Sequence, residues 1–370
     1  MKKKILFFHF DLKGGGAEKV LVNLVNNMDK SKYDITVQTL FGVGTHVKEL
    51  NKDIHFKYLF KKQFRGLPLL LRLFPPALLH RLIIRNEYDI EVAYLENTPT
   101  RIVSGCNNPK TKKIAWIHSM LFKKPKTYRS IHEMTECYMK FNKIVCVSNN
   151  VRESHEKFIQ HKNLPYCIVR NYIDSKHIIN CAKDNVELIN DGKLRIIFIG
   201  KLIESKGALR LLKLMHELFQ NGYDNWHLYY LGIGEQMEDI KESIKIWNLQ
   251  NIVTLLGYQD NPYKFIAKMD LYICASHAEG YCTAATEATI LGIPSLTTNC
   301  GGMKEIYNNG EYGLIVDNTD NALKEGIRKF LHDPQLLSYY KSQAIKRASY
   351  FESQTILKEN ENLFDSILNE

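Results

Sequence analysis

The stretch 271–288, LYICASHAEGYCTAATEA, decides the fold because it joins a strand, a glycine turn and a helix. The apolar run 271–276 is typical of a strand buried in a parallel sheet. Residues 283–291 predict a helix that ends at Gly292, with Pro294 just beyond. Glu279 therefore belongs to the strand-to-helix loop, and Glu287 lies about one turn into the helix.

This loop marks the candidate ligand site of the chain. In an open α/β sheet, ligands bind at the carboxyl ends of the strands, where free helix amides attract anions. Two carboxylates at that edge suit a polyhydroxylated ligand that carries phosphate. The alternative interpretation is that Glu279 is a solvated loop residue and Glu287 a charge on the helix surface, since such pairs also arise by chance.

Short apolar runs alternate with amphipathic stretches along the chain, which predicts βαβ units and parallel sheets. A length of 370 residues favours two domains. We predict an α/β fold with two Rossmann-like domains, residues 1–175 and 176–345, and a helix in 346–370 that returns to the first domain. The predicted strands are 5–10, 33–40, 88–94, 113–117, 143–147, 194–199, 226–231, 252–255, 271–276, 294–298 and 312–316.

The composition of the chain indicates the cellular compartment of the protein and the kind of partner it binds. No apolar run reaches the 18 residues of a membrane-spanning helix, and we interpret residues 1–10 as a first strand and not a signal peptide. The eight cysteines are scattered without a close pair, which favours reduced thiols in a cytoplasmic protein and predicts no metal cluster. The net charge of +10 divides into +15 for residues 1–165 and −5 for the rest. The first half is therefore expected to meet an anionic surface or ligand.

Residues 57–85 mix basic and aliphatic side chains around the pair Pro75-Pro76. We predict two short helices that contact the anionic inner leaflet of a membrane. The alternative is a helix pair packed on the sheet with its basic face in water. Nucleic acid is not an expected partner, because the basic residues are interleaved with aliphatic side chains and not with stacking aromatic ones.

Glycine-rich loops follow the first strand of each predicted domain. In Gly14-Gly15-Gly16-Ala17-Glu18, the glycines allow a close approach of the backbone to phosphate. A nicotinamide site would need Gly-x-Gly-x-x-Gly and an acidic residue ending the second strand, and the chain has neither. In the second domain, Lys201 and Lys206 are suited to a diphosphate, although two solvated loop lysines would be the simpler interpretation of that motif alone.

The order of the motifs resembles glycosyltransferase family 4, the retaining, nucleotide-sugar-dependent enzymes of the GT-B fold, in which two Rossmann-like domains face a central cleft. The resemblance runs from Gly14 to at least Asn321. The motifs that carry it are 14–18, His118, 147–148, 169–174, 200–207, 232–234, Glu279 with Glu287, and 301–302.

The resemblance implies roles for the matching residues. Glu279, His118 and Lys206 are the expected catalytic residues, with Lys206 on the donor diphosphate and Lys201 in the place of the usual arginine. Glu279 would bind hydroxyls of the donor sugar, and Glu287 the ribose hydroxyls. The further donor contacts implied are His118 with the sugar, Gly15 and Gly16 with phosphate, and the loop of Gly280, Tyr281, Cys282 and Thr283 with both.

The implied reaction moves a hexose or N-acetylhexosamine from a nucleotide sugar, a UDP-sugar, to a lipid-linked saccharide in bacterial surface or capsular polysaccharide synthesis. No Asp-x-Asp occurs, so neither a metal nor a cofactor is expected beside the donor. The implied location is cytoplasmic, on the inner face of the membrane. The alternatives are a nucleotide-sugar epimerase of the same fold and a non-catalytic nucleotide-sugar-binding subunit.

Overall fold

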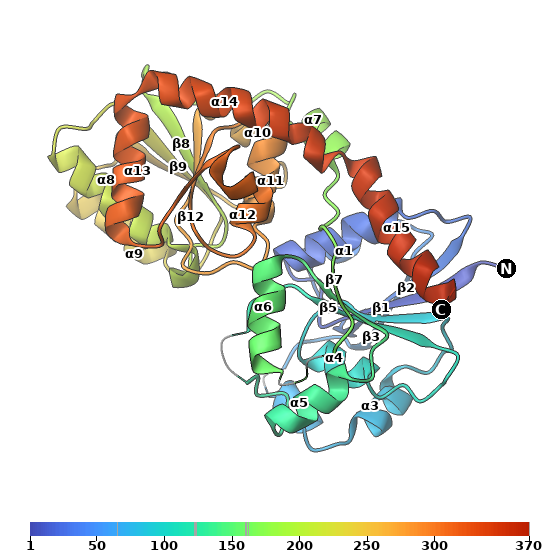
Figure 1. Ribbon diagram of the computed structural model, residues 1–370. Helices are drawn as coiled ribbons and strands as arrows, with labels where there is room; N and C mark the ends of the chain where they lie inside the picture. Colours follow the sequence, from blue (N-terminus) through green and yellow to red (C-terminus); the bar gives the residue numbers. More distant parts are fainter. Residues whose placement is uncertain (65, 122–123, 160, 162, 370) are drawn as a thin grey trace. The chain divides into compact units, whose positions relative to one another are not determined.

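The computed structural model describes residues 1–64, 66–121, 124–159, 161 and 163–369. The chain forms two compact units, the first of residues 1–173 and 354–370 and the second of residues 174–353 (Figure 1). Each unit contains one fully parallel sheet with helices packed against it. No helix in the described ranges has the length and apolar character needed to cross a membrane.

The first unit is built on a seven-stranded sheet with the strand order β3-β2-β1-β4-β5-β6-β7. At the centre of the sheet, residues 5–8 of β1 are apolar and fully buried, and all four residues of β4 are buried. The strands are β1 (Lys3–His9), β2 (Tyr33–Phe41), β3 (His55–Phe60), β4 (Ile90–Ala93), β5 (Lys112–Ile117), β6 (Lys143–Cys146) and β7 (Tyr166–Ile168). The helices are α1 (Gly16–Asn27), α2 (Leu67–Leu71), α3 (Pro76–Ile83), α4 (Thr98–Val103), α5 (Ile131–Tyr138) and α6 (Asn149–Phe158).

The second unit is built on a six-stranded sheet with the order β10-β9-β8-β11-β12-β13. Its core joins the apolar faces of α8 and α13 to the central strands. The strands are β8 (Leu194–Ile199), β9 (Trp226–Leu231), β10 (Val253–Gly257), β11 (Leu271–Cys274), β12 (Ser295–Thr298) and β13 (Leu314–Val316). The helices are α7 (Ser175–Cys181), α8 (Ala208–Gln220), α9 (Met237–Ile246), α10 (Tyr263–Ile266), α11 (Thr283–Ile290), α12 (Met303–Ile306), α13 (Asp320–His332) and α14 (Pro334–Ala348).

The C-terminal helix α15 (Ser353–Asn369) packs on the first unit (Figure 1). Phe364 is fully buried, and its ring lies against those of Phe7 and Trp116, with centroids 5.7 and 6.4 Å apart. The Tyr33 hydroxyl donates a hydrogen bond of 2.5 Å to Asp365. The aromatic contact with β1 and β5 therefore completes the core of the first sheet with residues from the other end of the chain.

The basic segment 57–85 differs in part from its prediction. Residues 57–60 belong to the edge strand β3 and not to a helix, because they pair in parallel with β2. The two predicted helices are present as α2 and α3, separated at the two prolines. Arg65, one of the basic residues of this segment, lies outside the described residues.

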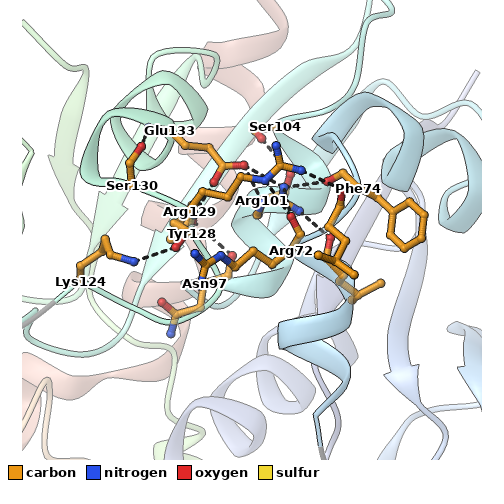
Figure 2. A network of polar contacts seen from close by, with 12 residues as sticks. Arg72, Phe74, Asn97, Arg101, Ser104, Lys124, Tyr128, Arg129, Ser130 and Glu133 are labelled. Atoms are coloured by element: carbon orange, nitrogen blue, oxygen red, sulfur yellow. Dashed lines mark hydrogen bonds and ion pairs between the residues drawn. The ribbon is translucent and has the colours of Figure 1, made fainter.

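Arg101 ties the turn between α2 and α3 to the body of the first unit. Its side chain is 1% exposed, and its guanidinium donates to the main-chain carbonyls of Leu71 and Phe74 at 3.1 and 2.7 Å. The same group pairs with the Glu133 carboxylate of α5 at 2.8 Å (Figure 2). A buried cation with these partners holds a loop that has little apolar contact of its own.

Candidate functional site

The candidate site of the second unit lies at the carboxyl ends of β8, β11 and β12, where their loops meet. Gly207 follows Lys206 with φ +71°, and a Cβ there would lie 2.1 Å from the Ala275 carbonyl. Gly301 has φ +50°, and a Cβ there would lie 2.4 Å from the Glu279 carbonyl oxygen. Only glycine fits such a backbone and such a close approach, so these two residues bring the three loops together.

Lys206 and Glu279 form the charged centre of this edge. The Lys206 Nζ lies 2.5 Å from Glu279 Oε2, and Ser276 Oγ donates to Glu279 Oε1 at 2.7 Å. Glu279 is 8% exposed, whereas the Lys206 side chain is 32% exposed. Burial disfavours the charge of Lys206, but the Glu279 carboxylate outweighs it and raises the pKa of the ammonium group. The pair therefore keeps a charged lysine partly open to a ligand.

Glu287 is also buried, at 6% exposure, on the second turn of α11. Its Oε1 accepts a hydrogen bond of 3.2 Å from the Tyr263 hydroxyl of α10. The interpretation of Glu279 and Glu287 as solvated surface charges is therefore wrong. Both carboxylates are held by neighbouring side chains, as ligand-binding groups usually are.

The loop between the two carboxylates leads into the N-terminus of α11. The amide of Gly302 donates to the Gly280 carbonyl at 3.0 Å, Tyr281 is half-buried, and Cys282 is the N-cap residue before Thr283. The first amides of a helix have no acceptor within it. This end of α11 thus offers donors to an anion.

Buried thiols surround the carboxylate of Glu279. Ligand atoms of Cys274, Glu279 and Cys282 all lie within 4.8 Å of one another. A hydrogen bond with the Cys282 thiol lowers the pKa of Cys274. A hydrogen bond with Cys300 and burial raise it by more, so that the pKa of Cys274 is about 12. The thiols of Cys274 and Cys282 are therefore neutral at physiological pH.

Sequence reasoning located part of this site and missed part of it. Lys201 is exposed on the loop after β8, as its position beyond a strand predicted. Ser276 and Tyr263 were not among the predicted site residues, although each donates to one of the two carboxylates. The position of Ser276, three residues before Glu279 at a strand end, was the available signal. Tyr263 is 24 residues away from Glu287, and no feature of the sequence pointed to it as a site residue.

His118 lies at the corresponding edge of the first unit, directly after β5. Its amide donates to Glu96 Oε2 at 3.1 Å, and the hydroxyl of Ser119 donates to the other carboxylate oxygen. The imidazole packs on the Tyr94 ring with centroids 4.9 Å apart. Burial, with the nearby His9, lowers the pKa of His118 to about 3. His118 is therefore a neutral imidazole at physiological pH.

His9 and the glycine loop lie at the same edge of the first sheet. The His9 Nδ1 atom lies 2.6 Å from the Asp11 carbonyl oxygen, and within the described ranges no partner reaches the buried Nε2 atoms of His9 and His118. Gly15 is the N-cap residue of α1, which begins at Gly16. Glu96 and His9 were not among the predicted site residues, although His9 ends one apolar strand and Glu96 follows another.

Two α/β units, each with a glycine loop and buried polar residues at the strand ends, define a protein of two Rossmann-like units with a candidate ligand site at the carboxyl ends of its strands. Sequence comparison then identifies the family. The pattern described as Glycosyltransferase Family 4 matches residues 14–177, and that described as Glycosyl transferases group 1 matches residues 182–347. The chain belongs to glycosyltransferase family 4, and it is a glycosyltransferase of the GT-B fold. The predicted family and fold class are thereby confirmed.

Similar proteins include two bacterial enzymes. One, from Campylobacter jejuni, is N-acetylgalactosamine-N,N'-diacetylbacillosaminyl-diphospho-undecaprenol 4-alpha-N-acetylgalactosaminyltransferase, 24% identical over 96% of this chain and 98% of its own. Another is the capsular polysaccharide biosynthesis glycosyltransferase CapM of Staphylococcus aureus, 31% identical over 50% of this chain and 49% of its own. The crystal structure of Anabaena HepE in complex with UDP and glucose shares the fold, with a TM-score of 0.77 at 18% identity over 98% of this chain and 100% of that one.

Proposed function

We propose that the protein transfers a hexose or N-acetylhexosamine from a UDP-sugar to a lipid-linked saccharide, with retention of the anomeric configuration, in bacterial surface or capsular polysaccharide synthesis. The observation that carries this proposal is the Lys206–Glu279 pair beside the N-terminus of α11. The acceptor class is supported by the Campylobacter relative, whose name specifies a diphospho-undecaprenol saccharide.

The charges at this edge suit the departure of a nucleoside diphosphate. In the proposed reaction, the bond between the anomeric carbon and the diphosphate breaks, and negative charge accumulates on the leaving oxygen. Lys206 and the free amides at residues 283–285 stabilise that charge. Lys201, on the same loop as Lys206, adds a second cation to the diphosphate.

The two buried carboxylates hold the sugar parts of the donor. Glu279 accepts hydrogen bonds from the sugar hydroxyls, and its charge favours the positive character that develops at the anomeric carbon. Glu287, fixed by Tyr263, accepts from the ribose hydroxyls. In the first unit, His118 is proposed to contact the donor sugar, and the amides of Gly15 and Gly16 to approach phosphate.

We propose that this transfer needs no metal ion, because a lysine and helix amides supply the positive charge that a metal would otherwise bring. Protein dialysed against EDTA should keep its turnover, and a complete loss of turnover would contradict this part of the proposal. Retention is measured separately, from the anomeric configuration of the product.

The proposed contact with the inner leaflet rests on solvent-facing side chains of α2, α3 and the residues that flank them. Leu67, Leu71, Leu79 and Ile83 are buried, so each helix is anchored on one side. On the other side, large apolar side chains are 36–69% exposed beside exposed basic residues. This combination fits the interfacial region of an anionic membrane. The exposed apolar residues are Leu69, Leu70, Leu73, Phe74, Leu78 and Leu82, and the exposed basic ones are Lys61, Lys62, Arg81 and Arg85.

Donor use is tested by incubating the purified protein with a panel of nucleotide sugars and a lipid-linked acceptor, and detecting products by mass spectrometry. The Glu279→Gln variant should lose about 100- to 1000-fold in kcat/KM, the effect of removing one group that stabilises transition-state charge. Glu204→Gln is the matched control, because Glu204 is exposed two residues before Lys206. Isomerisation of the donor without acceptor would favour an epimerase, and equal activity of both variants would contradict the proposal.

Membrane contact is tested by flotation with vesicles of phosphatidylglycerol. Replacing Leu70 and Leu73 by asparagine should weaken binding without lowering the melting temperature, because both side chains are at least half exposed. The control is Ile246→Asn, which removes a side chain of similar exposure, 64%, from the second unit. Equal flotation of both variants and the wild type would rule out this surface.

A further inference from the structure

We propose that His80, Glu91 and Cys106 form a binding site for a divalent transition-metal ion of the zinc class. The site is separate from the proposed donor site and from the transfer reaction. Glu91 is the second residue of β4, so it lies near the amino end of that strand, whereas Glu96 and His118 follow the carboxyl ends of β4 and β5. No residue of the proposed donor site contributes to it.

Three elements bring these ligands together. His80 lies on α3, Glu91 on β4, and Cys106 on the turn after α4. Gly105 permits this contact, because a Cβ at that position would lie 2.1 Å from the Pro76 carbonyl. The start of α3 therefore rests directly on the turn that carries the thiol.

The distances are near those of a metal site, in which the His80 and Glu91 ligand atoms would separate slightly and the thiol would move closer. The His80 Nε2 lies 2.8 Å from Glu91 Oε2, and one ligand atom of each of the three residues lies within 4.8 Å of the others. Ligands of a tetrahedral zinc ion are roughly 3.3–3.8 Å apart, as follows from bond lengths of about 2.0–2.3 Å. Small rotations of the side chains would thus bring all three into coordination.

The ligand types and their charges also fit. Nitrogen, carboxylate oxygen and thiolate sulfur together favour zinc over magnesium or calcium, which prefer oxygen alone. Binding of the ion releases the protons of the His80 imidazole and the Cys106 thiol to solvent. The neutral imidazole, carboxylate and thiolate that remain balance its two positive charges, which removes much of the cost of burying it. Glu91 is 2% exposed and Cys106 4% exposed, so an uncompensated ion would not be tolerated.

A cavity of about 410 Å³ adjoins the three side chains and gives the ion a path of entry. Three protein ligands leave a fourth position for water or a small anion, as in zinc sites that are not purely structural. The remaining wall of the cavity is mixed in character. Ala77 and Ile84 are apolar, Arg81 and Arg85 are basic, and Glu87 is acidic.

The experiment is a titration of the wild-type protein with Co²⁺, which reports thiolate coordination through its charge-transfer absorption. We expect one Co²⁺ per chain with a thiolate band, and displacement of that band by one equivalent of Zn²⁺. The Cys106→Ser variant should lose the band. His80→Asn provides a second variant, which leaves the thiol in place and should weaken binding at least tenfold.

Cys282→Ser is the matched control. Cys282, Cys274 and Glu279 form the other group of side chains in the described residues that could ligate a metal ion. This variant should keep the band. A wild-type protein without a thiolate band would overturn the proposal. A band lost in Cys282→Ser and kept in Cys106→Ser would also overturn it, because the ion would then belong to the proposed donor site. Circular dichroism of each variant confirms that the fold is retained.

Discussion

Replacing Lys206 by methionine should destabilise the second unit even in the absence of any ligand. Methionine keeps much of the aliphatic volume of lysine but leaves the Glu279 carboxylate without its ion-pair partner. Glu279 is 8% exposed and would keep only its hydrogen bond from Ser276 among the contacts described for its carboxylate. A carboxylate left unpaired in such a position is poorly solvated.

The size of the effect follows from the geometry of the pair. Two unit charges separated by the observed 2.5 Å attract each other by about 7 kcal/mol at an effective dielectric constant of about 20. Desolvation offsets much of this attraction, and removing one partner of a fully buried pair costs about 3–5 kcal/mol. The Lys206 side chain is 32% exposed, so water already weakens the pair, and we expect a loss of about 2 kcal/mol.

Differential scanning calorimetry measures this loss. For a unit of this size, about 2 kcal/mol should lower the melting temperature by about 4–8 °C. Lys201→Met is the matched control, because Lys201 lies exposed on the same loop and should change the melting temperature little. With UDP present, Lys206→Met should also bind about 10- to 100-fold more weakly, the value of one charged hydrogen bond.

The two measurements separate the ion pair from the proposed function. If Lys206→Met and Lys201→Met have the same melting temperature, the contact of Lys206 with Glu279 does not contribute to stability and the reasoning from the structure fails. If the variant is destabilised as expected but binds UDP as tightly as the wild type, the ion pair is structural and Lys206 does not hold the diphosphate.

Three further outcomes are expected. Gly301→Ala should cost about 1–3 kcal/mol, measured by urea unfolding, because alanine is strained at φ +50° and its Cβ would meet a main-chain carbonyl of the candidate site; an unchanged midpoint would contradict this. Arg101→Met should cost about 3–5 kcal/mol and speed proteolysis between residues 67 and 83, because it removes the ion pair with Glu133 and leaves the carbonyls of Leu71 and Phe74 without this buried donor; cleavage at the wild-type rate would disprove the tether. Burial lowers the pKa of His9 to about 4 and the pKa values of His118 and His155 to about 3, so these histidines take up protons in the unfolded chain at a higher pH than in the folded one. As the pH falls from 7 to 5, the free energy of unfolding of the first unit should therefore fall by up to about 2 kcal/mol for each of the three. Equal urea midpoints at the two pH values would refute this prediction.

Local signals were sufficient for most elements of both sheets. β1, β8 and β11 each contain a run of apolar residues followed by a glycine-containing loop, so these strands were predicted within a few residues. The edge strands β3 and β7 were not predicted. β3 carries His55 and Lys57 among its apolar residues, and β7 has only three residues, so neither gives the longer apolar run that identifies a strand.

The sequence by itself determined the class of fold and the loops that carry the candidate donor residues, because periodicity and glycine position act over a few residues. Only the tertiary structure decided which side chains meet. Lys206 and Glu279 are 73 residues apart, and they form a pair because parallel strands bring their loops to one edge. His80, Glu91 and Cys106 likewise come together through the close packing of α3 on the Gly105 turn. Burial of these groups, which sets their charge and reactivity, depends on chain segments distant in sequence.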